Sequence, residues 1–158
     1  MSRLNGTVNT ISLYISLDSR PSKGEYHWGI YVTDGQGEST VHHASNRDGP
    51  WRYDAEFVDP TNSMTLIAMI KVSDIRSPDL VEHAIRSVPA NGNPSGRNGD
   101  GFTCRTWVKD ALVSLHDSGA VVLPTDIETI EKKSIQYGMR YSRTSESGGG
   151  ATVFNDAF

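Results

Sequence analysis

The stretch Tyr26-His27-Trp28-Gly29-Ile30-Tyr31-Val32 decides the fold of the first half of the chain. Its even-numbered residues are aromatic or aliphatic, and they alternate with histidine, glycine and tyrosine. A period of two residues is typical of a β-strand that turns one face toward a core. The turn residues Asp34-Gly35-Gln36-Gly37 follow. We therefore expect this strand to form a hairpin with residues 39–44.

Three further strands are expected around this hairpin. Residues 10–17 alternate polar and apolar side chains, which predicts a strand with one buried face. Residues 55–58 and the apolar run 64–72 have the length of strands. Together with the hairpin they predict an antiparallel sheet of four to five strands.

Helices are expected to cover this sheet. Ser77-Pro78 provides an N-cap followed by proline, which predicts a helix that ends before Pro89. A stripe of apolar residues at 107, 108, 111, 112 and 115 predicts a helix that begins near Cys104. The capping-box pattern at residues 125–128 opens a third. The sequence thus predicts a single α+β domain over residues 1–142, with two to three helices.

Two segments are expected to lack regular structure. Residues 91–101 are rich in glycine and proline and predict a loop long enough to act as a lid over a substrate. Residues 143–158 begin with a polar, glycine-rich run and predict a flexible C-terminal tail.

Composition excludes several classes of protein. Of the 158 residues, 36% are hydrophobic and 22% charged, and the net charge is -4. Basic residues are scattered, so a nucleic-acid partner is not expected. No apolar run is long enough for a membrane span or a signal peptide. A single cysteine excludes an internal disulfide. We expect a cytoplasmic protein, with the oligomeric state left open.

Cys104 is the first candidate for chemistry. It lies in the first turn of its expected helix, where free backbone N–H groups and the helix dipole favour a thiolate. The alternative is a small buried hydrophobic residue in the stripe that follows. The flexible loop directly before Cys104 favours a nucleophile, because a nucleophile needs access.

Histidines supply the candidate base. His27 lies in mid-strand beside Gly29, which leaves room for another group to approach the imidazole. His42 and His43 point to opposite faces of the next strand, so one of them can stand beside His27. The alternative for each is a hydrogen-bonded or solvent-facing histidine with no catalytic role. A zinc site made by the three histidines and Cys104 is weaker, because their spacing is not that of metal ligands.

The expected surroundings of the thiol and imidazole complete the candidate site. Arg105, like Arg97 and Lys109, could bind a carboxylate or stabilise a thiolate, although a solvated surface charge is the alternative. Aromatic residues are more often core than pocket walls. The residues expected to contact substrate are Thr103, Arg105, Trp28, Tyr31 and His42.

Residues 26–32, Val41-His42-His43-Ala44 and Phe102-Thr103-Cys104-Arg105-Thr106-Trp107-Val108 together resemble the circularly permuted NlpC/P60 superfamily, which has a papain-like architecture. The pattern is most similar to the lecithin:retinol acyltransferase-like proteins. The resemblance implies His27 as base, His43 as orienting residue with His42 as the substitute, and Cys104 as nucleophile.

The resemblance has a limit at the nucleophile. The acyltransferases usually have Asn-Cys-Glu where this chain has Thr103-Cys104-Arg105, so it does not imply transfer to lipid. The HWG and FTC stretches also resemble small uncharacterised fungal proteins.

Three functions follow as hypotheses. The first is a thiol hydrolase or acyltransferase that acts on an amide, ester or thioester of a small-molecule or acyl substrate, with no cofactor or metal. The second is a non-hydrolytic binding or cyclising protein of a biosynthetic (secondary-metabolite) pathway on the same fold. The third is an interaction domain. Only the first requires Cys104 and His27 side by side.

Overall fold

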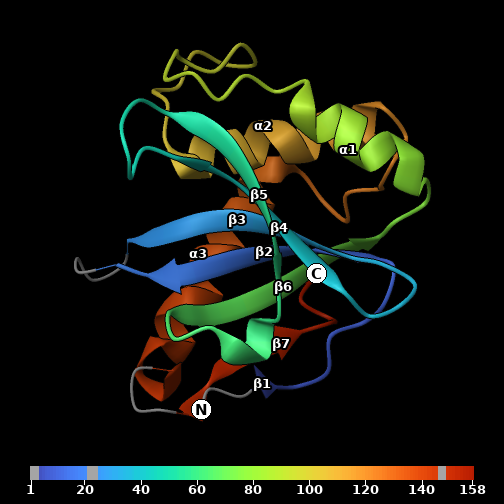
Figure 1. Ribbon diagram of the computed structural model, residues 1–158, viewed down its shortest axis with the longest axis vertical. Helices are drawn as coiled ribbons and strands as arrows, with labels where there is room; N and C mark the ends of the chain where they lie inside the picture. Colours follow the sequence, from blue (N-terminus) through green and yellow to red (C-terminus); the bar gives the residue numbers. More distant parts are fainter. Residues whose placement is uncertain (1–3, 21–24, 146–148) are drawn as a thin grey trace.

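The computed structural model describes residues 4–20, 25–145 and 149–158. It is an α+β structure in which the described strands form one seven-stranded mixed sheet, in the order β1-β7-β6-β2-β3-β4-β5 (Figure 1). The strands are β1 (Leu4–Asn5), β2 (Ser12–Ser19), β3 (Tyr26–Thr33), β4 (Ser39–Ser45), β5 (Arg52–Val58), β6 (Leu66–Asp74) and β7 (Ala151–Phe154). The helices are the 3-10 turn η1 (Pro60–Asn62), α1 (Pro78–Arg86), α2 (Cys104–Asp117) and α3 (Ile127–Thr144).

The helices begin where the sequence predicts. Ser77 is the N-cap of α1 with proline at the first helical position. The Thr103 side chain accepts a hydrogen bond from the backbone N–H of Thr106 and so caps α2. Asp126 caps α3 in the same way through Thr129. The Thr103 and Asp126 caps each satisfy a backbone donor that has no partner within the helix, whereas the Ser77 side chain makes no capping hydrogen bond.

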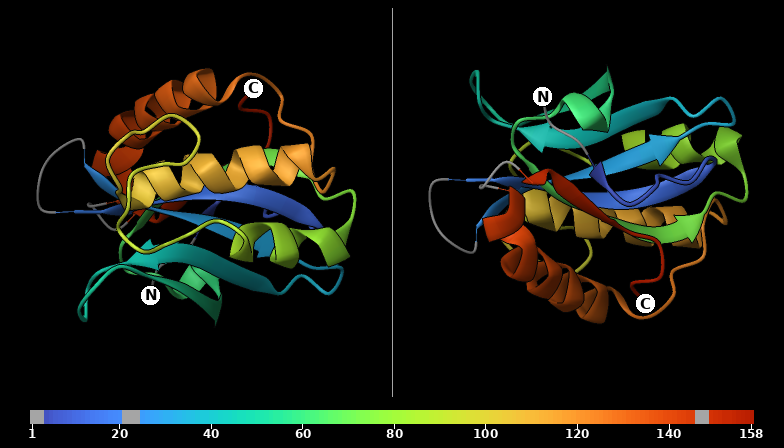
Figure 2. Two further views of the ribbon diagram at one scale, coloured as in Figure 1. Left: turned by 90° about the horizontal axis from the view of Figure 1, so that it is seen from above. Right: turned by 90° about the horizontal axis from the view of Figure 1, so that it is seen from below.

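The sheet has two unlike faces. α2 packs on β3 and β4, while α3 packs on β6 and β2, so both lie on one face (Figure 2). We call this the helix face. It holds the main apolar core, which includes Leu17, Trp28, Ile30, Trp107 and Leu112.

The opposite side is the groove face. A smaller apolar cluster around Tyr14, Tyr31 and Met69 covers one part of it, packed against Leu4 and Val8 of the N-terminal segment. Residues Ser12 to Leu17 of β2 are therefore buried on both sides, whereas their alternation predicts burial on one side only. The physical reason is the N-terminal cover, which alternation within a strand does not reveal.

Three expectations about the fold need correction. The sheet has seven strands among the described residues, not four to five, and it is mixed because β7 runs parallel to β1 and β6. The segment expected as a tail includes the end of α3 and the strand β7. Residues 146–148 of that tail lie outside the described residues. Short β7 is stabilised by a partner on each side, which its own composition does not indicate.

The expected loop at residues 91–101 contains no helix or strand. No helix within the described ranges has the length and the apolar character needed to cross a membrane.

Candidate functional site

Cys104 is the first residue of α2 and lies against the backbone of β3. The residue is 5% exposed. Its Sγ accepts a hydrogen bond from the backbone N–H of Trp28 at 3.4 Å and lies 3.9 Å from the carbonyl oxygen of Tyr26. A thiolate would gain from this donor and from the free N–H groups of the helix start.

The divergence of two strands makes room for this contact. β3 pairs with β2 from Tyr26 onward, but its pairing with β4 begins only at Ile30, opposite His42. The early part of β3 therefore has one edge free of strand pairing, and the thiol of Cys104 occupies that edge. The candidate site therefore lies where β3 and β4 diverge.

His27 and His43 form a direct hydrogen bond on the groove face. His27 Nε2 lies 2.8 Å from His43 Nδ1, and the two rings meet edge to face. His43 Nε2 in turn lies 3.8 Å from Oδ2 of Asp54, which is its partner in the β4–β5 register. The three neighbouring strands β3, β4 and β5 thus bring His27, His43 and Asp54 into one line.

Arg20 connects this line to the thiol. Its Nη2 lies 3.0 Å from His27 Nδ1 and 3.8 Å from Cys104 Sγ. A guanidinium group only donates, so Nδ1 of His27 is the acceptor and its proton is on Nε2. That Nε2–H donates to His43, whose remaining N–H points toward Asp54. The hydrogen bonds therefore assign one tautomer to each imidazole.

Burial keeps both imidazoles neutral. It lowers the pKa of His27 to about 4, and the charges of His43, Arg20 and Arg47 act in the same direction. Burial also lowers the pKa of His43, although the carboxylate of Asp54 opposes this shift. Near neutral pH His27 thus carries an unprotonated Nδ1, which is the state that a general base requires.

Arg20 was not among the residues that the sequence singled out. It stands three residues beyond the alternating segment 10–17, and it approaches His27 because β2 and β3 pair as neighbours. The alternation of residues 10–17 could have predicted that Arg20, just after this strand, lies near the beginning of the strand that contains His27. It could not have shown that the guanidinium reaches both the imidazole and the thiol.

A groove of about 860 Å³ opens beside the two histidines. Its lining is polar and carries both signs of charge, while Cys104 is not part of the lining. The charged side chains and histidines that line it are Asp18, Arg20, His27, His43, Arg47, Asp48, Arg52, Asp54, Glu56 and Asp59.

His42 lies apart from this group. Its Nδ1 bonds the hydroxyl of Tyr53 at 2.7 Å, and it lines a separate cavity of about 500 Å³ next to α1. Burial lowers its pKa to about 4, opposed by Glu82. Of the two adjacent histidines, the structure therefore brings His43 and not His42 to His27.

The other expected contact residues lie in different places. Tyr31 lines the groove, whereas Trp28 is buried in the core of the helix face. Arg105 forms an ion pair with Glu131 of α3 at 3.0 Å. Thr103 is next to the thiol but uses its hydroxyl to cap α2. Tyr31 is thus the one of these four that faces the groove.

A metal could be held beside the histidine pair. Ligand atoms of His43, Asp54 and Glu56 lie within 4.8 Å of one another. This set differs from the histidine and cysteine set considered from the sequence. One imidazole and two carboxylates suit a divalent cation of intermediate hardness.

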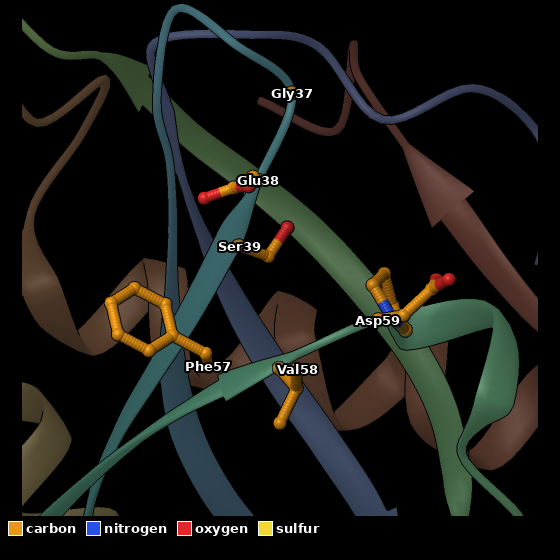
Figure 3. A pocket seen from close by; sticks show the side chains of 7 residues that line it. Gly37, Glu38, Ser39, Phe57, Val58 and Asp59 are labelled. Atoms are coloured by element: carbon orange, nitrogen blue, oxygen red, sulfur yellow. The ribbon is translucent and has the colours of Figure 1, made fainter.

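A further pocket lies at the start of β4 and the end of β5 (Figure 3). It measures about 500 Å³ and is lined by residues that include Glu38, Ser39, Phe57 and Asp59. No histidine or cysteine is among its lining residues. It therefore offers no pairing of nucleophile and base.

Comparison with known proteins gives a family without an assigned activity. Residues 10–147 match a family of unknown function (DUF6914), and this range contains Arg20, His27, His43 and Cys104. No curated protein and no solved structure matches the chain. Because the match covers most of its length, the chain belongs to the family of unknown function DUF6914.

Proposed function

We propose that this protein is a thiol-dependent hydrolase or acyltransferase that uses Cys104, His27 and His43. The observation that carries the proposal is the contact of one Arg20 nitrogen with both Cys104 Sγ and His27 Nδ1. The thiol and the free imidazole nitrogen therefore face a common point. This arrangement of cysteine, histidine and second histidine also supports the NlpC/P60-like character that the sequence motifs imply.

The proposed reaction begins when Arg20 leaves the space between the two groups. His27 Nδ1 then takes the thiol proton, and Cys104 Sγ attacks the carbonyl carbon of an ester, thioester or amide. The bond to the leaving group breaks, and the imidazolium returns the proton to that group. Water or an amine then attacks the thioester on Cys104 and releases the acyl group.

Other parts of the site assist these steps. His43 accepts the Nε2 proton of His27 in a hydrogen bond, which fixes the tautomer and the orientation of the base. Free N–H groups in the first turn of α2 are placed to stabilise an oxyanion next to Sγ. Trp28 N–H stabilises the thiolate itself.

The test follows covalent labelling of Cys104. p-Nitrophenyl acetate should add one acetyl group to Cys104, detected by intact mass and peptide mapping. His27→Ala should slow this acylation by roughly a hundredfold, the usual contribution of a general base. His83→Ala is the matched control, because His83 is an exposed histidine of α1. Equal rates in the wild type and His27→Ala would reject the proposal.

The second candidate is a non-hydrolytic binding or cyclising protein. It is favoured by one observation, namely that the buried Cys104 does not line the groove. Such a protein would keep its activity toward its ligand in Cys104→Ala, while a thiol enzyme would lose it. A Cys104 that reacts with iodoacetamide only after unfolding would also favour this candidate.

A further inference from the structure

Asp18 stands next to the proposed base. It lies opposite His27 in the β2–β3 pairing, and both residues line the groove. The carboxylate accepts one hydrogen bond, from the hydroxyl of Thr65 at 3.3 Å. Within the described residues no lysine, arginine or histidine forms an ion pair with it. Asp18 is therefore a half-buried carboxylate without a described counter-charge.

This environment makes ionisation of Asp18 without a positively charged partner unfavourable. Burial raises the pKa of Asp18 to about 6, and the hydrogen bond from Thr65 opposes the shift only in part. Near neutral pH most molecules still carry the negative charge. A charge in such a place gains much from a cation that also donates hydrogen bonds.

Ser16 is a second polar residue of β2 among those that line the groove. It precedes Asp18 by two residues on β2, so both side chains point to the groove face. Ser16 is 0% exposed, and its Oγ has no hydrogen-bond partner among the described residues. A buried hydroxyl without a partner is rare and unfavourable. The half-buried Asp18 carboxylate can be reached from the groove, whereas the Ser16 hydroxyl is fully covered.

Gly29 makes room for the Ser16 hydroxyl between β2 and β3. It is the register partner of Ser16, and a Cβ at this position would lie 2.8 Å from Ser16 Oγ. Any side chain at residue 29 would therefore displace the hydroxyl.

We propose that the groove binds an acyl group with a primary ammonium close to its carbonyl, held by the Asp18 carboxylate. This substrate class rests on the proposed function. In the resting structure the Arg20 guanidinium is directed at His27 and Cys104 and not at Asp18.

Strand geometry limits the distance between ammonium and carbonyl. Side chains paired across antiparallel strands have Cβ atoms about 5 Å apart. An ammonium at Asp18 therefore lies within a few bonds of a carbonyl held between His27 and Cys104. An α-aminoacyl ester, thioester or amide satisfies this limit, and the thiol attack described above transfers its acyl group to Sγ.

Two thioesters of N-acetylcysteamine test the proposal. The glycyl and propionyl thioesters differ only in an ammonium that replaces a methyl group. The wild type should cleave the glycyl compound with the higher kcat/KM, and Asp18→Asn should reduce this preference roughly ten- to a hundredfold. Asp48→Asn is the control, because Asp48 lines the groove with an exposed carboxylate paired to Arg52. The control should keep the preference.

A binding experiment does not depend on catalysis. Glycinamide should shift the imidazole NMR signals of His27 in Cys104→Ala more strongly and at lower concentration than propionamide does. Ser16→Ala in the same background is a control: it should leave glycinamide binding unchanged, because the hydroxyl is covered, and the melting temperature unchanged or raised, since it removes an unsatisfied hydroxyl.

The outcomes separate the two proposals. If neither thioester is cleaved but glycinamide binds selectively, the thiol-enzyme function fails and the ammonium site stands. If glycinamide and propionamide bind equally, the ammonium site is overturned. If Asp18→Asn slows both thioesters by the same factor, Asp18 serves a cation of the chain itself, and the site is again overturned.

Discussion

The two faces of the sheet use the same strands for different purposes. On the helix face, side chains such as Trp28, Ile30 and Leu17 are buried against α2 and α3. On the groove face, their neighbours His27 and Asp18 are polar and have altered pKa values. Alternation along β2 and β3 thus directs the side chains that stabilise the fold to one face and those of the candidate site to the other. Four substitutions or conditions can break or sharpen this comparison.

The largest effect is expected on the helix face. Leu112→Ala should lower the free energy of unfolding by about 2–5 kcal/mol, because Leu112 is 0% exposed and its loss leaves a cavity. Urea denaturation measures the change. Phe57→Ala is the control, since Phe57 is 85% exposed and should have little effect. Similar losses in both variants would mean that the helix face is not the main core.

The groove face should tolerate extra volume poorly at one position. Gly29→Ala should cost about 1–3 kcal/mol of unfolding free energy, because a new Cβ would crowd Ser16 Oγ and Val41 Cγ2. Gly96→Ala is the matched control, because a Cβ there would meet no atom within 4 Å. A Gly29→Ala variant as stable as the wild type would show that β2 and β4 can move apart.

Lowering the pH should destabilise the fold through one histidine on each face of the sheet. The folded pKa of His27 and of His42 is about 4, below the ordinary value of 6.5. Between these values the unfolded chain binds more protons, so these groups make stability fall as pH drops from 6.5 toward 4. Denaturation curves at several pH values test this.

The control for the acid experiment is His42→Asn. It should reduce the dependence of the unfolding free energy on pH in the window from 6.5 to 4. An unchanged dependence would contradict the lowered pKa of His42.

The smallest effect is expected at Asp18 and has the opposite sign. Its folded pKa of about 6 lies above the ordinary 3.8, so its ionisation destabilises the fold above pH 6. Asp18→Asn removes this charge and should therefore raise the unfolding free energy at pH 7 by about 1 kcal/mol. The gain stays this small because solvent screens the charge of a half-buried group. The gain should disappear below pH 3.8. A gain that persists there would have another cause than charge.

Local sequence signals predicted much of the fold. The N-cap signal at Ser77, the capping-box pattern at residues 125–128 and the apolar stripe after Cys104 predicted the helix starts, because these signals act within one turn of the chain. Alternation located β2 and β3, and the turn at residues 34–37 located β4. None of these signals revealed β1 or β7, whose short strands depend on partners at the other end of the chain.

Residue types and order along the chain were enough to single out Cys104, His27 and a histidine of the pair 42–43. Local reasoning left His42 and His43 equivalent, because each points to one face of the strand. The β3–β4 pairing and the cover by α1 decide which face meets His27.

What the sequence determined by itself is the set of strands and helices with strong local signals, together with the residues that can carry thiol chemistry. The tertiary structure alone decided that β3 and β4 diverge at the thiol, that Arg20 joins Cys104 to His27, and that Asp18 lines the groove beside His27 with a hydrogen bond from Thr65. The reason is physical. Periodicity and capping act within a few residues, whereas hydrogen-bond partners and burial depend on how distant strands pair.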